Sequence, residues 1–131
     1  MKSLLICALV IILFSACLEK IDPSKLKNTE WELTELPGST LPATAMATLS
    51  FGEGLKISGK SFCNSYGGQI EITDNKVVLK NFFSTKMFCK QSDAIERAYL
   101  AALKETNNAK LIDDRLYLLN GKKTLLIFNK Y

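Results

Sequence analysis

The side chains of this sequence that could support chemistry are its cysteines, carboxylates and serines, and their pattern excludes most catalytic mechanisms. The 131 residues include four cysteines and no histidine. Without histidine, a serine–histidine or cysteine–histidine nucleophile is excluded, and the commonest general base near neutral pH is missing. The pair Asp113–Asp114 falls in a predicted turn, where carboxylates are solvated rather than directed at one substrate from shaped walls. We therefore assign no catalytic residue and expect no enzymatic activity.

Cys63 and Cys89 are the cysteines that lie within the predicted folded domain. In an oxidising compartment such a pair forms a structural disulfide. Free cysteines are also among the most buried residue types, so two reduced, buried thiols are the alternative. A zinc site is not expected, because two thiolates without histidine do not complete a tetrahedral ligand set. We predict neither a metal nor an organic cofactor.

The N-terminal segment has the three regions of a secretory signal in order. A lysine supplies positive charge, residues 4–14 are apolar, and small residues precede Cys17. Residues 14–17 (FSAC) resemble the lipobox of bacterial lipoproteins, in which a peptidase cuts before the cysteine and the thiol is lipidated. The resemblance implies a signal peptide over residues 1–16 and a lipid on Cys17. The alternative is a cleaved signal that releases an unlipidated protein.

A lipid on Cys17 would place the protein in the cell envelope, attached to the membrane. Leu18 stands where an aspartate retains enteric lipoproteins in the inner membrane, so we expect the outer membrane. Residues 17–29 contain a proline and several charged side chains, and we predict that they form a flexible tether. The net charge of +4 is mild and the lysines are scattered, so we expect no nucleic-acid partner. The expected partners are the membrane and an envelope protein.

Short segments that alternate apolar and polar side chains predict strands after the tether. These strands cover residues 31–36, 46–51, 55–59, 69–73, 76–79, 110–112, 115–119 and 124–128, with 82–89 as further extended chain and 61–68 as loop. Short turns at Asp74-Asn75, Asp113-Asp114 and 120–123 make neighbouring strands antiparallel. The predicted class is mainly β (α+β): about eight short, mostly antiparallel strands in a curled sheet or small open barrel.

One amphipathic helix is expected to pack on this sheet. Ile95, Tyr99 and Leu103 recur at helical spacing and form an apolar stripe with two alanines. Asp93 and Glu96 are spaced like a capping pair at its first turn. Phenylalanine and methionine are frequent over residues 82–88, and we expect the helix to cover the apolar face that they would otherwise expose.

Several segments then match a known pattern in the right order. They are Trp31-Glu32-Leu33, Phe51-Gly52, Ile57-Ser58-Gly59, Ser61 to Gly68, Ser84 to Cys89, Glu96 to Leu103 and Leu125 to Phe128. Together they resemble the META domain of HslJ-like heat-shock lipoproteins of bacterial envelopes. The chain departs from the family at Phe62, where a glycine is usual, and phenylalanine tolerates positive φ poorly.

The resemblance covers residues 28–130, and we assign residues 30–131 to a META-like domain. It implies a small β-rich fold with a helix against a curved sheet, an envelope location, and an association with stress and antibiotic tolerance. It implies no reaction. The expected function is non-enzymatic binding or support of envelope proteins, and the alternative is a carrier that holds a small ligand inside the curled sheet.

The segment around Cys63 contains the remaining candidates, Asn64, Tyr66 and Gly67. Asparagine and glycine recur in turns for backbone reasons, so Asn64 is expected to fix a loop by bonding main-chain groups. The alternative is that these three residues line a binding surface.

Overall fold

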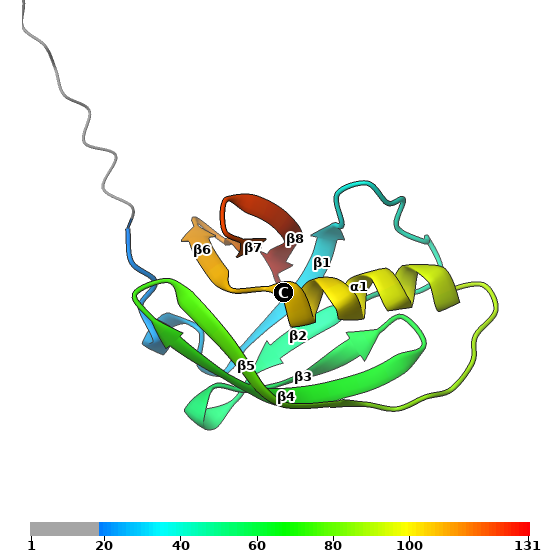
Figure 1. Ribbon diagram of the computed structural model, residues 1–131, viewed down its shortest axis with the longest axis horizontal. Helices are drawn as coiled ribbons and strands as arrows, with labels where there is room; N and C mark the ends of the chain where they lie inside the picture. The colour runs from blue at the N-terminus through cyan, green and yellow to red at the C-terminus, as the bar shows by residue number, and fades with distance from the viewer. Residues whose placement is uncertain (1–18) are drawn as a thin grey trace, which may run out of the picture.

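Eight antiparallel strands form a closed barrel in the computed structural model, which describes residues 19–131 (Figure 1). The strands are β1 (Thr29–Glu35), β2 (Thr48–Phe51), β3 (Lys56–Ser61), β4 (Asn64–Thr73), β5 (Lys76–Ser84), β6 (Asn108–Ile112), β7 (Arg115–Asn120) and β8 (Lys123–Lys130). Helix α1 (Asp93–Glu105) connects β5 to β6, and short 3₁₀ turns cover η1 (Pro23–Lys25) and η2 (Glu53–Leu55). The predicted class of about eight antiparallel strands with one helix is confirmed.

The barrel closes through neighbouring strands in chain order, but one seam is short. β1 pairs with β8, which removes the two edges that an open sheet would expose. β5 and β6 share only the pair Lys76 and Asn108, so these strands diverge beyond it. Helix α1 lies beside this opening (Figure 1) and buries Tyr99 and Leu103 against the interior. The helix thus completes the wall that the strands leave open.

The prediction of a loop over residues 61–68 is wrong, because most of this segment belongs to β4. Ser61 of β3 pairs with Asn64 of β4, and two residues form the turn between them. Phe62 occupies that turn with φ of 74°, so the positive backbone angle for which the family usually has glycine is kept by phenylalanine. Its ring meets Tyr99 edge to face, with centroids 6.0 Å apart, and this contact offsets part of the backbone strain.

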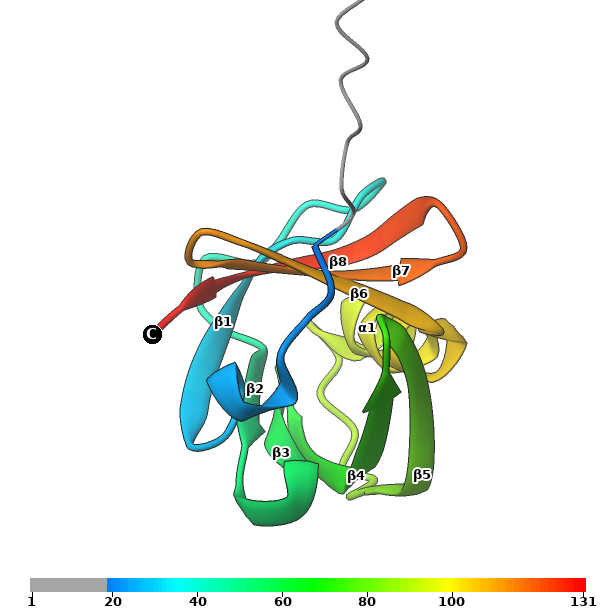
Figure 2. The same cartoon turned by 90° about the vertical axis from the view of Figure 1, so that its left-hand side faces the viewer.

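The predicted tether is packed against the barrel from Ile21 onward. Ile21 and Leu26 are 7% and 1% exposed and belong to the core. The Ile21 amide donates to Asn75 Oδ1 at 2.7 Å, and the Asp22 carboxylate accepts from the Ser24 amide at the start of η1. Figure 2 shows this N-terminal segment crossing one end of the barrel. The expectation of a flexible tether over residues 17–29 is therefore wrong from residue 21 onward, because buried apolar side chains hold the segment in place.

Candidate functional site

The residues of the two cysteine segments meet at the end of the barrel that contains the β3–β4 turn. Here that turn, the loop between β5 and α1, and the first turns of α1 come together. A disulfide joins Cys63 in the turn to Cys89 in the loop, with Cα atoms 6.0 Å apart. We call Ser61, Asn64 and Glu96, with the main chain they bind, the Glu96 network.

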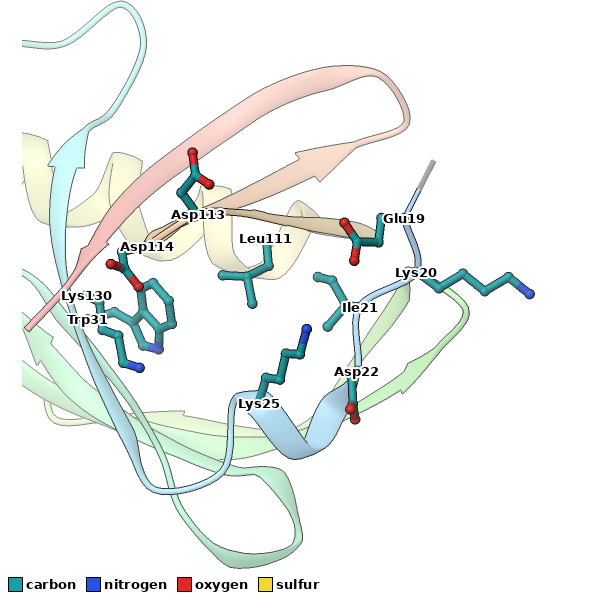
Figure 3. A pocket seen from close by; sticks show the side chains of 10 residues that line it. All are labelled: Glu19, Lys20, Ile21, Asp22, Lys25, Trp31, Leu111, Asp113, Asp114 and Lys130. Atoms are coloured by element: carbon teal, nitrogen blue, oxygen red, sulfur yellow. The ribbon is translucent and has the colours of Figure 1, made fainter. Parts of the chain in front are cut away.

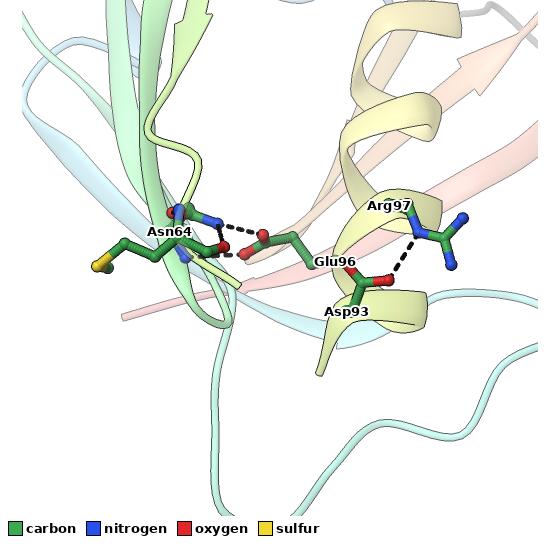
Figure 4. A network of polar contacts seen from close by, with 5 residues as sticks. Asn64, Asp93, Glu96 and Arg97 are labelled. Carbon is green, nitrogen blue, oxygen red and sulfur yellow. Dashed lines mark hydrogen bonds and ion pairs between the residues drawn. The ribbon is translucent and has the colours of Figure 1, made fainter. Parts of the chain in front are cut away.

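The carboxylate of Glu96 leaves α1 and accepts hydrogen bonds from the β3–β4 turn. Its Oε2 accepts from the Ser61 hydroxyl at 3.0 Å, the Cys63 amide at 3.0 Å and the Asn64 amide at 2.8 Å. Its Oε1 accepts from Asn64 Nδ2 (Figure 4). Glu96 is only 7% exposed, and Ser61 and Asn64 are buried as well. A single carboxylate therefore accepts from four donors at this turn.

These hydrogen bonds determine the ionisation of Glu96. Burial disfavours the charged form and raises the pKa of a carboxyl group. The donors from Asn64, Ser61 and Cys63 act in the opposite direction and together outweigh burial, so the pKa of Glu96 is lowered from its ordinary value. The group is a fixed anion at neutral pH, which suits a structural acceptor and not a proton donor.

Asn64 extends the network from the turn to the loop before α1. Its Oδ1 accepts from the Met87 amide at 2.7 Å and the Thr85 hydroxyl at 2.9 Å. Its Nδ2 donates to the Met87 carbonyl at 3.0 Å as well as to Glu96. Asn64 thus fixes a loop through main-chain contacts, as the first of the two interpretations of this residue proposed.

The prediction of a capping pair at the start of α1 is wrong. The Ser92 side chain makes no capping hydrogen bond, and Asp93 forms an ion pair with Arg97 at 3.0 Å instead (Figure 4). Glu96 points away from the helix toward the Asn64 turn. The Glu96 carboxylate, which local spacing assigned to a helix cap, therefore accepts hydrogen bonds from the β3–β4 turn instead.

Tyr66 lies inside the barrel rather than on a binding surface. Its hydroxyl donates to the Thr48 carbonyl at 2.6 Å and lies 2.8 Å from the Tyr99 hydroxyl. Burial raises the pKa of both tyrosines, so both are neutral. Gly67 is also buried, and a Cβ at this position would lie 2.6 Å from the ring of Phe83. Tyr66 therefore binds Thr48 and Tyr99 within the barrel, and the absence of a side chain at Gly67 leaves room for the ring of Phe83.

Apolar side chains are exposed where the Glu96 network holds the loop. Phe83, Met87 and Phe88 are 66%, 63% and 75% exposed. We call residues 83–88, which are the last two residues of β5 and the start of the loop that follows it, the apolar loop. The expectation that the helix covers this face is wrong. α1 buries its apolar side chains, such as Tyr99 and Leu103, at the opening between β5 and β6. Asn64 and the disulfide instead attach the loop at Met87 and Cys89, and its apolar side chains are exposed.

Asp113 and Asp114 lie in the β6–β7 turn, far along the chain from the Glu96 network. Both carboxylates are exposed, and they border a cleft of about 330 Å³ beside the N-terminal segment (Figure 3). Lys25 and Lys130 line the same cleft, with the ring of Trp31 as part of its wall. Solvated carboxylates with lysines nearby are not the enclosed pair that carboxylate catalysis requires.

The structure identifies no metal-binding group within residues 19–131: no three side chains of the ligating types are clustered there. In the same part of the chain, no helix is long and apolar enough to cross a membrane. Cys17 and the predicted signal peptide lie outside the described residues.

Sequence reasoning missed Glu96 as the centre of the site, although one signal was present. Glu96, Tyr99 and Leu103 share the spacing of a single buried helix face, so a glutamate stood within the apolar stripe. A buried carboxylate needs hydrogen-bond donors, and those donors come from a turn far away in the sequence. Only their meeting in the fold could show which residues they were.

Comparisons with known proteins agree with this architecture. Heat shock protein HslJ of Escherichia coli (strain K12) is 27% identical over 108 residues, which cover 80% of this chain and 76% of that protein. One protein solved by NMR has a TM-score of 0.69 at 25% identity, covering 83% of this chain and 94% of its own. A second NMR structure, from Burkholderia xenovorans, has a TM-score of 0.69 at 24% identity and covers 86% of this chain and 90% of its own. The META domain family model matches residues 24–131, and the chain belongs to the META domain family.

Proposed function

We propose that this chain is a lipid-anchored protein of the bacterial cell envelope, attached to the outer membrane through Cys17. Its META domain works by binding an envelope protein and not by catalysis. The name of its E. coli relative, a heat shock protein, supports a role under stress, and tolerance of antibiotics belongs to the same proposal. The signal-like N-terminus that ends at Cys17 supports the lipid anchor.

The apolar loop carries the binding part of this proposal. Water-exposed phenylalanine and methionine side chains on a segment whose main chain is held by hydrogen bonds are typical of contact surfaces. Here Phe83, Met87 and Phe88 are exposed, while Asn64 binds both the amide and the carbonyl of Met87. A loop whose conformation is already fixed loses less conformational entropy when a partner binds.

A ligand carrier is less well supported, because the barrel interior is filled. The apolar cavity among the described residues is about 20 Å³ and is lined by side chains such as Leu49, Val77 and Leu118. A cavity of that size accommodates about one water molecule, whereas small-molecule pockets occupy roughly 300 Å³ or more.

Photocrosslinking in intact envelopes tests the binding role. A photoreactive phenylalanine analogue at Phe88 is expected to crosslink to one envelope protein, and Phe83→Ser in the same chain should reduce the yield about tenfold by removing an apolar contact. Ile112 is apolar and 53% exposed on β6, so the same analogue there is the matched control. Equal crosslinking from positions 88 and 112, or no effect of Phe83→Ser, would contradict a specific role for the apolar loop.

The anchor is tested separately by replacing Cys17. Cys17→Ser is expected to abolish incorporation of labelled fatty acid and leave the precursor uncleaved, because lipidation requires the thiol. Cys7→Ser, within the predicted signal, is the control and should be labelled and processed normally. Normal labelling of Cys17→Ser, measured by gel shift and autoradiography, would refute the anchor.

A further inference from the structure

Four lysines that are far apart in the sequence surround one groove of the barrel. The groove occupies about 650 Å³, and its charged lining residues are Lys20, Lys76, Lys110, Lys122 and Asp74. We call it the lysine groove. Lys20 pairs with Asp74 at 3.0 Å. Within the described part of the chain, Lys76, Lys110 and Lys122 take part in no ion pair, so the groove has a net positive charge.

The fold assembles this groove from three segments: the β4–β5 turn, the start of β6 and the β7–β8 turn. The β4–β5 turn meets the beginning of β6, where the Ala109 amide donates to the Asn75 carbonyl at 3.0 Å. The β7–β8 turn is held beside them, because the Gly121 amide donates to Asn107 Oδ1 at 2.8 Å. The main-chain segments that carry the lysines are therefore joined around one groove, although the sequence contains no polybasic run.

The N-terminal chain leaves the barrel at this same face. Asn75 Nδ2 donates to the Glu19 carbonyl at 3.4 Å, and its Oδ1 accepts from the Ile21 amide. Cys17 is two residues before Glu19, and two residues of chain span at most about 7 Å. A lipid on Cys17 would thus bring the lysine groove close to the membrane surface.

We propose that the lysine groove docks on the anionic phospholipid headgroups of the membrane in which Cys17 is anchored. This inference rests on the proposed lipidation of Cys17. Each lysine near an anionic bilayer adds to the attraction, and an acyl chain combined with basic side chains anchors more firmly than either one alone.

Docking through this groove also orients the domain. The apolar loop lies at the other end of the β4–β5 hairpin, since β4 runs from the Asn64 turn to the Asp74-Asn75 turn. At about 3.3 Å per residue, the length of β4 separates the two ends by roughly 30 Å. The membrane would face one end of the barrel, and the apolar loop would be presented to a partner at the other.

Lysine footprinting on the anchored protein tests this orientation. The mature chain, coupled through the Cys17 thiol to a maleimide phospholipid in nanodiscs, makes the test independent of whether cells lipidate Cys17. We expect acetylation of Lys76, Lys110 and Lys122 to be about fivefold slower in phosphatidylglycerol discs than in phosphatidylcholine discs. High salt should remove the difference, because it screens exposed charges.

The lysines at the opposite end provide the matched control. Lys60, Lys86 and Lys90 are exposed near the disulfide and should be acetylated equally in both kinds of disc. Changing Lys76, Lys110 and Lys122 to glutamate should turn the domain away from the anionic surface and increase the acetylation of Lys20 in phosphatidylglycerol discs. Changing Lys60, Lys86 and Lys90 to glutamate should leave the acetylation of the groove lysines unaltered. Equal acetylation of the groove in both discs, or protection of the opposite end instead, would overturn the proposal. Absence of fatty-acid labelling in cells would overturn the proposed anchor and not the affinity of the groove.

Discussion

Glu96→Gln is expected to destabilise the domain by about 3 kcal/mol at pH 7, because hydrogen bonds to a buried charged acceptor are stronger than those to a neutral one. The carboxylate accepts from Ser61, Cys63 and both nitrogens of Asn64. An amide cannot accept all of these bonds, and its own N–H groups would face donors. Urea unfolding at equilibrium, followed by tryptophan fluorescence, measures the loss, since the chain has one tryptophan and it is buried.

The same variant should lose a pH dependence that the native domain has. The pKa of Glu96 is lower in the folded protein than its ordinary value, because its hydrogen bonds outweigh burial. Its contribution to stability is therefore complete above the unfolded pKa of about 4.3 and declines as the pH falls from there toward the folded pKa. The difference in unfolding free energy between native protein and variant should shrink over that acidic range.

Asp93→Asn provides the control for Glu96→Gln, because it removes a carboxylate one turn away on the same helix. Asp93 pairs with Arg97 on the surface, where Arg97 is 74% exposed, and such pairs contribute less than about 1 kcal/mol. We expect little change in stability. A Glu96→Gln protein as stable as the Asp93→Asn protein at neutral pH would show that the network does not hold the turn.

Gly59→Ala is expected to destabilise the domain by about 3 kcal/mol or more, through steric overlap inside the barrel. A Cβ at Gly59 would lie 2.0 Å from the Thr48 carbonyl oxygen and 2.8 Å from the Tyr66 hydroxyl. The Thr48 carbonyl oxygen accepts a hydrogen bond from the Tyr66 hydroxyl. The methyl group would therefore press on two atoms that are bonded to each other and cannot move apart without breaking that bond. β2 and β3 would have to separate, which would disturb the contact between Tyr66 and Tyr99 as well.

Gly52→Ala is the matched control for Gly59→Ala. Gly52 has a negative φ, and a Cβ there would meet only the Lys56 carbonyl, at an ordinary 3.8 Å. Restricting the unfolded chain should then leave stability unchanged or raise it by a few tenths of a kcal/mol. Thermal unfolding of both variants checks the pair, and similar transition temperatures would contradict the close approach of β2 and β3.

The periodicity of the sequence predicted most of the barrel because alternation is a local property. Side chains two residues apart face the same side of a strand, so a pattern such as that in β1 shows its buried face without knowledge of its neighbours. The turns at Asp74-Asn75 and Asp113-Asp114 were predicted for a similar reason. Asp74, Asn75 and Asp113 all have positive φ, which these residue types adopt more readily than most.

The candidate site was only partly predictable because its members come from separate segments. Asn64 was expected to bind main-chain groups, and it does so at Met87. Glu96 was assigned to the helix terminus, because the spacing to Asp93 fits a local motif as well as a tertiary one. Whether Glu96 caps the helix or binds elsewhere depended on whether hydrogen-bond donors lay opposite α1. The pairing of β3 with β4 places those donors, which belong to Ser61, Cys63 and Asn64, in the turn that faces the helix.

By itself, the sequence determined the strand pattern, the exclusion of histidine-based catalysis and the signal-like segment that ends at Cys17, since all of these follow from composition and neighbouring residues. Tertiary structure decided which side chains meet. It buried Glu96 against the Asn64 turn, packed Ile21 and Leu26 on the barrel, turned the apolar loop outward, and brought scattered lysines to the face where the N-terminal chain leaves. The physical reason is that burial and long-range strand pairing act between segments distant along the chain, where local patterns carry no information about distance.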